Sequence, residues 1–515
     1  MIVAAPEPKA QIRRAFAEYI EAVRHPRAWQ GPMVHYNSWF DFHSWQERGM
    51  QNIALLSQLK EDIMDERGVL DRIAGFEELA RRGVHLDSFL LDDGWDDPDE
   101  LWTPDRMHFP RGFSKVSAAL QEKLRSGLGI WLSPWGGYGD AQNRRIALAK
   151  RQGLETNSGG LSLAGPLYSA RFKEAVQRFR CDANVNMFKF DGFAGDKTEM
   201  PQEVEAMLSL ISEVREACPS SSGRRGFADS RRRRDDDSIW INLTTGTWPS
   251  PFFLLWADSI WRGNGDLGAM RSSTPSLLSV TEGLSPRQRW QVWRDCVVHE
   301  NVVQRAPLFP IGRLMVHGVV LGAHGEALAK DLDKFTKQDW AQEVWSLAAM
   351  GLQLQELYIS HQLMNEMAWD ELAEALKWAK SKWHILEDAH WAIPMLVNTH
   401  DDAKEFPPYA VASYHDGEGV LMLRNPRNKV QLAPKFTIAS VLELPERMWE
   451  KRAAMKTVRS ISLRQDSLDK PLNCDTLLGV VGSGRCHLDP RAQVSMRMEP
   501  GELLVLSIKM WDRVY

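Results

Sequence analysis

The stretch "SARFKEAVQRFRCDANVNMFKFDG", residues 169–192, joins a helical pattern to a short apolar strand. Apolar residues recur at helical spacing through 169–183, and the run 187–190 is typical of a buried strand. The same alternation of helix and strand recurs along the chain from about residue 30. Because strands joined through helices run parallel with right-handed crossovers, the pattern predicts an α/β fold.

Repeated strand–helix units of this kind favour a (β/α)8 TIM barrel over an open sheet. The strands are predicted at 33–42, 87–95, 128–137, 187–192, 238–248, 258–266, 305–312 and 352–360. The helices are predicted at 72–84, 115–127, 169–183, 201–219, 285–304 and about 368–384. The segment 313–340 is irregular, so the seventh unit is the least defined.

The pattern changes after about residue 395. The segment 409–426 reads as two strands around a turn that contains Gly417 and Gly419, and 501–511 alternates again. We therefore expect an α/β chain in which a TIM barrel is followed by a C-terminal antiparallel β-sandwich domain. The expected parts are an N-terminal helical extension (1–29), the barrel (30–395) and the β domain (400–515).

Composition narrows the classes of partner. The 515 residues are 43% hydrophobic and 25% charged, an ordinary globular balance, and the net charge of −5 gives no reason to expect nucleic acid or an anionic membrane. No apolar run reaches the ~18 residues of a membrane-spanning helix. The first residues lack the apolar core of a signal peptide, so the protein is expected in the cytoplasm or, after removal of a leader, outside the cell.

Two further features carry little functional weight. The five cysteines are scattered, which predicts free thiols rather than a disulfide framework or a zinc site. The charged segment 220–238 is interpreted as a solvated loop, with nucleic-acid binding as the alternative. It joins a helix to the next strand and therefore belongs to the face of a barrel opposite the usual site.

Charged residues stand at the ends of three predicted strands, where the strands of a barrel converge. They are Asp92, Asp93, Lys189, Asp191, Arg262 and Asp266. Buried charges are costly unless they are paired, so such a cluster predicts a binding site for a polar ligand. A ring of ion pairs that ties the strands together is the alternative interpretation.

Two carboxylates from different strands, without a metal-binding histidine cluster, fit glycoside hydrolysis. A separation of about 5–5.5 Å predicts retention of configuration, and about 6.5–9.5 Å predicts inversion. Lys189 favours an ionised, nucleophilic Asp191, and Asp92 and Asp93 are suited to accept hydrogen bonds from sugar hydroxyls. Among the 21 tryptophans, those near the strand ends are candidates to stack on a sugar ring: Trp39, Trp95 and Trp135.

Four motifs resemble those of the α-galactosidase/α-N-acetylgalactosaminidase superfamily, the melibiase-like glycoside hydrolase families 27 and 36. They are "LDDGW" (91–95), "KFDG" (189–192), "TWP" (247–249) and "WRGNGD" (261–266), and they occur in the family order. The plan of a barrel followed by a β domain is also similar.

The resemblance implies a retaining double displacement, with Asp191 as nucleophile and Asp266 as acid and then base. It implies no metal and no organic cofactor. It places these residues at the substrate: Asp92, Asp93, Lys189, Arg262, Thr247, Trp248 and Ser250. Asp258 ranks below Asp266, because Asp266 has the Arg-x-x-x-Asp spacing from Arg262; a structural role is its alternative.

The chain departs from the family in the loop that faces the sugar's 2-substituent. Animal family 27 galactosidases have glutamate where Thr247 stands and leucine where Ser250 stands, whereas the N-acetylgalactosaminidases have small residues at both positions. The small Thr247 and Ser250 favour room for a 2-acetamido group, and both sugars stay open. The family's disulfides near these strands are absent.

The expected function is a retaining exo-α-glycosidase that hydrolyses terminal α-linked galactose or N-acetylgalactosamine. A transglycosylase using the same residues and a non-catalytic carbohydrate-binding barrel are the alternatives. The expected partner is an oligosaccharide or glycoconjugate, with a homo-oligomer possible and neither nucleic acid nor membrane involved.

Overall fold

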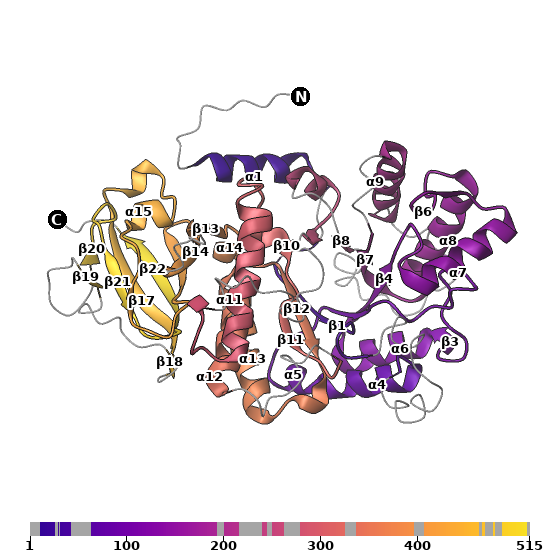
Figure 1. The fold of residues 1–515 in the computed structure, drawn as a ribbon, viewed down its shortest axis with the longest axis horizontal. Coiled ribbons are helices and arrows are strands. Elements are labelled where there is room, and N and C mark those ends of the chain that lie inside the picture. The colour runs from indigo at the N-terminus through magenta and orange to yellow at the C-terminus, as the bar shows by residue number, and fades with distance from the viewer. Residues whose placement is uncertain are drawn as a thin grey trace, which may run out of the picture.

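The computed structural model describes most of the chain, which forms a barrel followed by a β domain (Figure 1). The described residues are 11–25, 29, 31–42, 63–192, 200–215, 239–244, 250–261, 279–324, 336–395, 406–462, 466–468, 477–478 and 487–511. No helix among them is long and apolar enough to cross a membrane.

A parallel sheet curls into the barrel. Its order is β10-β9-β8-β7-β4-β2-β1-β12-β11. The strands are β1 (Met33–Asn37), β2 (Ser88–Leu91), β4 (Gly127–Leu132), β7 (Val185–Phe190), β8 (Trp240–Leu243), β9 (Ser259–Trp261), β10 (Leu314–Met315), β11 (Val319–Leu321) and β12 (Leu354–Ile359). The predicted TIM-like architecture is confirmed, and the seventh position is shared by two short strands, since β10 pairs with β9 and β11 with β12.

The prediction of a strand at 305–312 is wrong. This segment holds turns and leads into the 3-10 helix η6 (Ile311–Arg313), and the seventh strand follows it. Pro307 and Pro310 lack the backbone N–H that a central strand must donate, which explains why the strand lies further along. Between β10 and β11 the chain is kinked at His317, whose φ is 49°.

Helices cover the outside of the barrel. They are α4 (Glu66–Gly75), α5 (Glu77–Arg81), α6 (Ser114–Ala119), α7 (Gly139–Gln152), α8 (Pro166–Asp182), α9 (Pro201–Arg215), α11 (Pro286–Val298), α12 (Lys337–Ala349), α13 (Glu366–Ser381) and α14 (Trp383–Leu386). Short turns of π helix extend α6 at η2 (Leu120–Leu124) and α11 at η5 (His299–Val303), and the 3-10 helix η8 (His361–Leu363) precedes α13. The helix predicted at 72–84 is thus two helices, and the first begins where the Asp65 side chain accepts a hydrogen bond from Gly68 N.

The N-terminal helix α1 (Ile12–Val23) packs on the barrel at the connection between β8 and β9. The described part of that connection holds the 3-10 helix η4 (Pro251–Leu255), and the ring of Phe16 meets that of Phe252 edge-on at 5.9 Å. Helix α1 also contacts residues much later in the sequence. There Arg13 forms ion pairs with Asp388 at 2.8 Å and Glu443 at 2.9 Å.

The C-terminal part is antiparallel, as predicted. One sheet has the order β13-β14-β15-β22-β17-β18, with β20 also paired to β17, and a smaller sheet has the order β16-β21-β19. The strands are β13 (His390–Ile393), β14 (Tyr409–His415), β15 (Glu418–Arg424), β16 (Gln431–Leu432), β17 (Arg452–Ile461), β18 (Asp466–Leu468), β19 (Leu477–Leu478), β20 (His487–Leu488), β21 (Ser495–Met498) and β22 (Leu503–Trp511). The hairpin predicted around Gly417 is β14–β15.

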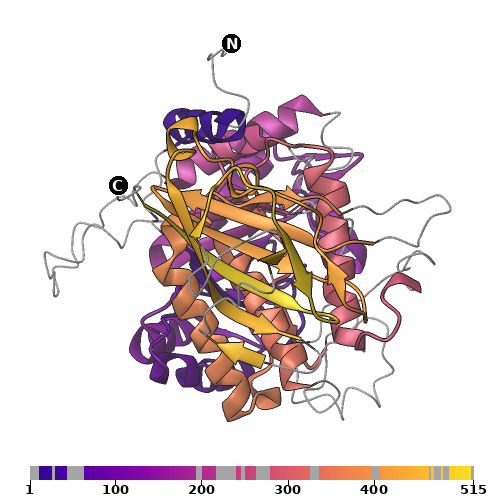
Figure 2. The same ribbon diagram turned by 90° about the vertical axis from the view of Figure 1, so that its left-hand side faces the viewer.

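The large sheet is buried on both faces. Alternate residues of a strand point to opposite sides, so each strand contributes to two apolar clusters. Leu421 and Leu423 face the small sheet and the short helix α15 (Ile438–Val441), whereas Val420 and Met422 face the barrel. On that side lies α12, whose residues 339–349 are all buried. Gln342 in α12 donates hydrogen bonds to Ile461 O and Gly501 O, at 2.9 and 2.6 Å. Figure 2 shows the sheet lying across the barrel.

The cysteines depart from expectation at one described position. Cys181, in α8, is disulfide-bonded, so the prediction of a free thiol is wrong there. Cys296, in α11, is a buried free thiol, as predicted.

Candidate active site

The interior of the barrel changes from apolar to polar towards the carboxyl ends of its strands. Met33, Met187 and Leu354 belong to a buried apolar cluster inside the barrel. Two residues further along the same strands stand His35, Lys189 and Glu356, which the period of two brings to the same interior side. The register pairs His35 with Glu356 across β1–β12 and Lys189 with Asn242 across β7–β8.

Lys189 is ion-paired inside this polar layer. Its Nζ lies 2.6 Å from Asp92 Oδ2, and both side chains are buried. Asp92 stands just after β2 and is fixed at two further points: its backbone N–H donates to Ser38 Oγ, and its Oδ1 accepts from Asp93 N. The structure therefore brings together the lysine of the "KFDG" motif and the first aspartate of the "LDDGW" motif.

Asp191 follows β7 at the mouth of the barrel and is 7% exposed. Its Oδ2 accepts a hydrogen bond from Trp131 Nε1 at 3.0 Å. Its Oδ1 accepts from the Tyr138 hydroxyl at 2.9 Å and from Gly192 N at 2.6 Å. The backbone turns at Gly192 with a φ of 82°, in the region that favours glycine. The carboxylate is thus oriented by donors on both oxygens.

Asp93 is the group best placed to take a new partner. It is 6% exposed, and its Oδ1 has no hydrogen-bond partner among the described residues. Burial raises the pKa of Asp93 to about 7, against the opposing charge of Arg145. Arg145 itself holds Asp96 through both carboxylate oxygens at 2.8 Å, and both residues are fully buried. A buried oxygen without a partner is expected to bind a ligand or a water.

Two neutral histidines flank Lys189. Burial lowers the pKa of His35 and of His317 to about 3, and the positive charge of Lys189 adds to the effect. Burial raises the pKa of Glu356 to about 7. Glu356 accepts hydrogen bonds from Val316 N at 2.9 Å and from the Tyr358 hydroxyl at 2.7 Å, so it bridges the kink between β10 and β11.

Sequence reasoning missed these layer residues and Tyr138. A usable signal existed for two of them: His35 and Glu356 are polar residues at inward positions of strands that are otherwise largely apolar. Tyr138 carried no such signal, because it lies in a loop and its place depends on how the loop folds.

The predicted stacking tryptophans lie in different places. Trp95 is fully buried, packs edge-on against Phe113 and Phe179, and donates to Trp131 O at 2.9 Å. It offers no exposed ring face, so the prediction that it stacks on a sugar is wrong. Its indole instead supports the strand that carries Trp131.

Trp135 and Trp39 remain near the mouth of the barrel. Trp135 is almost fully buried and donates to Glu203 Oε2 at 2.9 Å, and a Cβ at position 192 would lie 3.8 Å from its ring. Trp39 is partly exposed just after β1, and its backbone N–H donates to Asn37 Oδ1 at 2.9 Å.

The remaining predicted site residues are described only in part. Ser250 is partly buried at the start of η4. Four others lie outside the described residues, as does the charged segment 220–238: Arg262, Asp266, Thr247 and Trp248.

Asp258 has a structural role, the alternative to a catalytic one. It precedes β9, at the end of the barrel opposite Asp191, and is 1% exposed. Its carboxylate pairs with Arg24 at 2.8 Å and with Arg215 at 2.7 Å, and it accepts from Ile241 N at 2.8 Å. These contacts tie α1 and α9 to the sheet.

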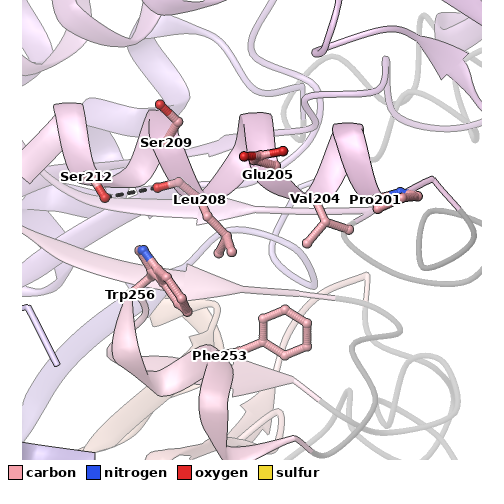
Figure 3. A pocket seen from close by; sticks show the side chains of 8 residues that line it. All are labelled: Pro201, Val204, Glu205, Leu208, Ser209, Ser212, Phe253 and Trp256. Carbon is pink, nitrogen blue, oxygen red and sulfur yellow. Dashed lines mark hydrogen bonds between the residues drawn. The ribbon is translucent and has the colours of Figure 1, made fainter. Parts of the chain in front are cut away.

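The described part of the chain holds no group of three His, Cys, Asp or Glu residues that would bind a metal ion. A groove of about 580 Å³ lies between α9 and η4 (Figure 3), where Leu208 and Val204 face Trp256 and Phe253. Its lining is mainly apolar and lies outside the sheet, so it is separate from the polar strand ends.

Comparison with known proteins bears on the fold. No family model and no curated protein matches the sequence. Among solved structures, the chain is similar to the GH36 α-galactosidase AgaA from Geobacillus stearothermophilus, with 12% identity and a TM-score of 0.54. It is similar to the α-galactosidase from Lactobacillus brevis, with 11% identity and a TM-score of 0.54. In both cases the match covers 98% of this chain and 59% of the other, so the chain spans about three fifths of their length.

The fold is that of these glycoside hydrolases. It is not peculiar to galactosidases, since the α-amylase from Geobacillus thermoleovorans also matches, with 10% identity, a TM-score of 0.50 and coverage of 94% of this chain and 99% of the other. The likeness therefore supports the architecture alone.

Proposed function

We propose that this protein is a retaining exo-α-glycosidase that hydrolyses terminal α-linked galactose or N-acetylgalactosamine. The observation that carries the proposal is Asp191, an oriented carboxylate at the mouth of a TIM-like barrel beside the buried Lys189–Asp92 pair. The "WRGNGD" motif, which begins at the last residue of β9, is proposed to supply the second carboxylate, Asp266. This is the residue set that a double displacement needs.

In the first step, Asp191 attacks the anomeric carbon while Asp266 gives its proton to the departing glycosidic oxygen. The product is a glycosyl ester of Asp191. In the second step, Asp266 takes a proton from water, whose oxygen attacks the same carbon and restores the Asp191 carboxylate. The donors Trp131 and Gly192 hold this carboxylate during both steps.

Substrate recognition is assigned to the polar groups next to Asp191. Asp93 Oδ1 has no partner among the described residues and is suited to a sugar hydroxyl. Lys189 and Asp92, already paired, present a fixed donor and acceptor beside it. Arg262 is expected to act with Asp266. The loop that contains Thr247, Trp248 and Ser250 is proposed to face the substituent at C2, where its small residues leave room for a hydroxyl or an acetamide.

The first test measures hydrolysis of p-nitrophenyl α-galactoside and p-nitrophenyl α-N-acetylgalactosaminide. We expect turnover of at least one, and a loss of about 10⁴-fold or more in kcat for Asp191→Asn, because the nucleophile is removed. The matched control is Asp140→Asn, which changes an exposed carboxylate at the start of α7 and is expected to keep the wild-type rate.

Each other outcome contradicts part of the proposal. Wild-type kinetics in Asp191→Asn would remove Asp191 as the nucleophile. Binding of either sugar without turnover would make the protein a carbohydrate-binding barrel. Transfer of the sugar to an added saccharide in preference to water would make it a transglycosylase.

A further inference from the structure

We propose that Tyr138 is a positioning residue that serves the second chemical step, the release of the sugar from Asp191. The inference rests on the proposed function and extends it to a residue outside the four motifs. Its basis is the hydrogen bond from the Tyr138 hydroxyl to Asp191 Oδ1, together with the way in which the loop of Tyr138 is held.

Tyr138 differs from the other donors to Asp191. Trp131 lies in a barrel strand and is 1% exposed, and Gly192 donates through its backbone, so both donors are fixed by the sheet. Tyr138 is 38% exposed and reaches Asp191 from the residue just before α7. It is therefore a donor that can be removed without disturbing the barrel.

Three glycines shape the loop that carries Tyr138. Gly136, Gly137 and Gly139 have φ values of 101°, 78° and 57°, in the region that favours glycine. Arg145 donates to Gly136 O at 2.8 Å and is itself fixed by its bidentate pair with Asp96. A buried ion pair thus anchors the loop two residues before Tyr138.

Space around the loop is equally restricted. A Cβ at Gly137 would lie 2.8 Å from Arg145 Nη1 and 3.1 Å from the Trp131 ring. The start of the loop is held through Trp135, whose indole donates to Glu203 in α9, and Glu203 also accepts from Asn157 at 2.9 Å. A side chain at position 137 is therefore expected to displace Tyr138 from Asp191.

The second step shows why a donor at this place matters. Water oxygen forms a bond to the anomeric carbon, the bond from that carbon to the Asp191 oxygen breaks, and its electron pair stays on the carboxylate. The proton of water passes to the Asp266 carboxylate. Negative charge grows on Asp191 during this step and declines during the first step, so a donor to Asp191 accelerates the second step in particular.

The test is Tyr138→Phe, assayed with p-nitrophenyl α-galactoside and p-nitrophenyl α-N-acetylgalactosaminide. Removal of a hydrogen bond to a charged group is expected to lower kcat by about 10- to 100-fold. KM should fall with kcat, because the glycosyl-enzyme accumulates, and intact-protein mass spectrometry of the quenched reaction should show the variant carrying one sugar. Gly137→Ala, which moves the same phenol, should show the same signature.

Tyr414→Phe is the matched control, because it removes a buried phenol hydroxyl in β14, within the C-terminal domain. It should show wild-type kcat and KM. Suppose that the wild type is active and that Tyr138→Phe lowers kcat, but KM does not fall and no sugar-bearing enzyme accumulates. Tyr138 is then merely structural, and the inference is overturned while the proposed function stands. Unchanged kinetics overturn it in the same way. If the wild type hydrolyses neither glycoside, the proposed function fails and the inference fails with it.

Discussion

At the scale of single residues, Lys189 explains how a charged side chain can stand inside a barrel. Its ammonium group is desolvated, and the carboxylate of Asp92 at 2.6 Å compensates for the loss of water. The charge also keeps its surroundings neutral, since the lowered pKa values of His35 and His317 reflect Lys189 as well as burial. Burial, reinforced by the charge of Lys189, therefore lowers the pKa of both histidines in the layer beneath Asp191.

Lys189→Met tests the balance of this pair. Removing one partner leaves Asp92 buried and uncompensated, so the free energy of unfolding should fall by about 3–5 kcal/mol. The double variant Lys189→Met/Asp92→Asn has no uncompensated charge and should recover most of this loss. Denaturant titration measures both variants. A double variant no more stable than Lys189→Met would contradict the account.

At the scale of elements, the split seventh strand is closed by a side chain. The kink at His317 interrupts the strand between β10 and β11, and Glu356 in β12 accepts the hydrogen bond of Val316 N in place of a neighbouring strand. A buried carboxyl group thereby replaces one of the backbone hydrogen bonds between neighbouring strands. Because burial raises its pKa to about 7, this closure is linked to pH.

The sign of the linkage follows from the direction of that shift. The folded protein holds the Glu356 proton up to about pH 7, whereas the unfolded chain releases it near the ordinary value of 4.5. The stability contributed by Glu356 is therefore full at low pH and is lost as the pH rises to about 7, by about 3 kcal/mol. Asp87 and Asp93, each with a pKa raised by burial to about 7, add losses of the same sign.

Glu356→Gln should remove the part of the pH-dependent loss of stability that Glu356 causes. The amide can accept from Val316 N and donate to the Tyr358 hydroxyl, which keeps both contacts. Measured by denaturant unfolding between pH 5 and 8, the variant should lose less stability with rising pH than the wild type. Glu366→Gln, at an exposed position, is the control. The same pH dependence in Glu356→Gln as in the wild type would refute the linkage.

Strands were easier to predict than their connections, for physical reasons that particular elements show. The apolar runs of β4, β7 and β12 are buried on both sides and read directly as parallel strands. Helix α12 was missed because it is buried on all sides: polar residues such as Gln342 and Glu343 lie inside, so the usual contrast between an apolar and a solvated face is absent. Asp92 and Asp191 were found through their place after apolar runs and Lys189 as the charge within one, whereas the position of Tyr138 depends on a glycine-rich loop and on Arg145.

At the scale of the whole molecule, barrel and β domain share buried polar contacts. The Tyr409 hydroxyl in β14 donates to Asp295 Oδ2 in α11 at 2.5 Å, and Arg424 in β15 lies 3.3 Å from the same oxygen. Asp295 is fully buried, and both of these contacts to its Oδ2 come from the β domain. Groups that satisfy one another across an interface make the two domains depend on one another for stability.

Tyr409→Phe tests that dependence. It takes a donor from a buried carboxylate and should lower the free energy of unfolding by about 1–3 kcal/mol. Calorimetry should show one transition that moves as a whole, because both domains lose the contact together. Tyr414→Phe, which leaves the interface intact, should have a smaller effect. A barrel transition that stays in place while a second one moves would show independent domains.

The contacts of α1 have a consequence for the order in which the protein is made. Arg13 and Glu443, which form an ion pair, are 430 residues apart in sequence. A ribosome releases α1 long before it releases this partner, and long-range contacts of this kind form late. The ion pair that joins α1 to Glu443 can therefore form only after the first part of the β domain has been made, whereas the contacts of α1 with η4 need only the barrel.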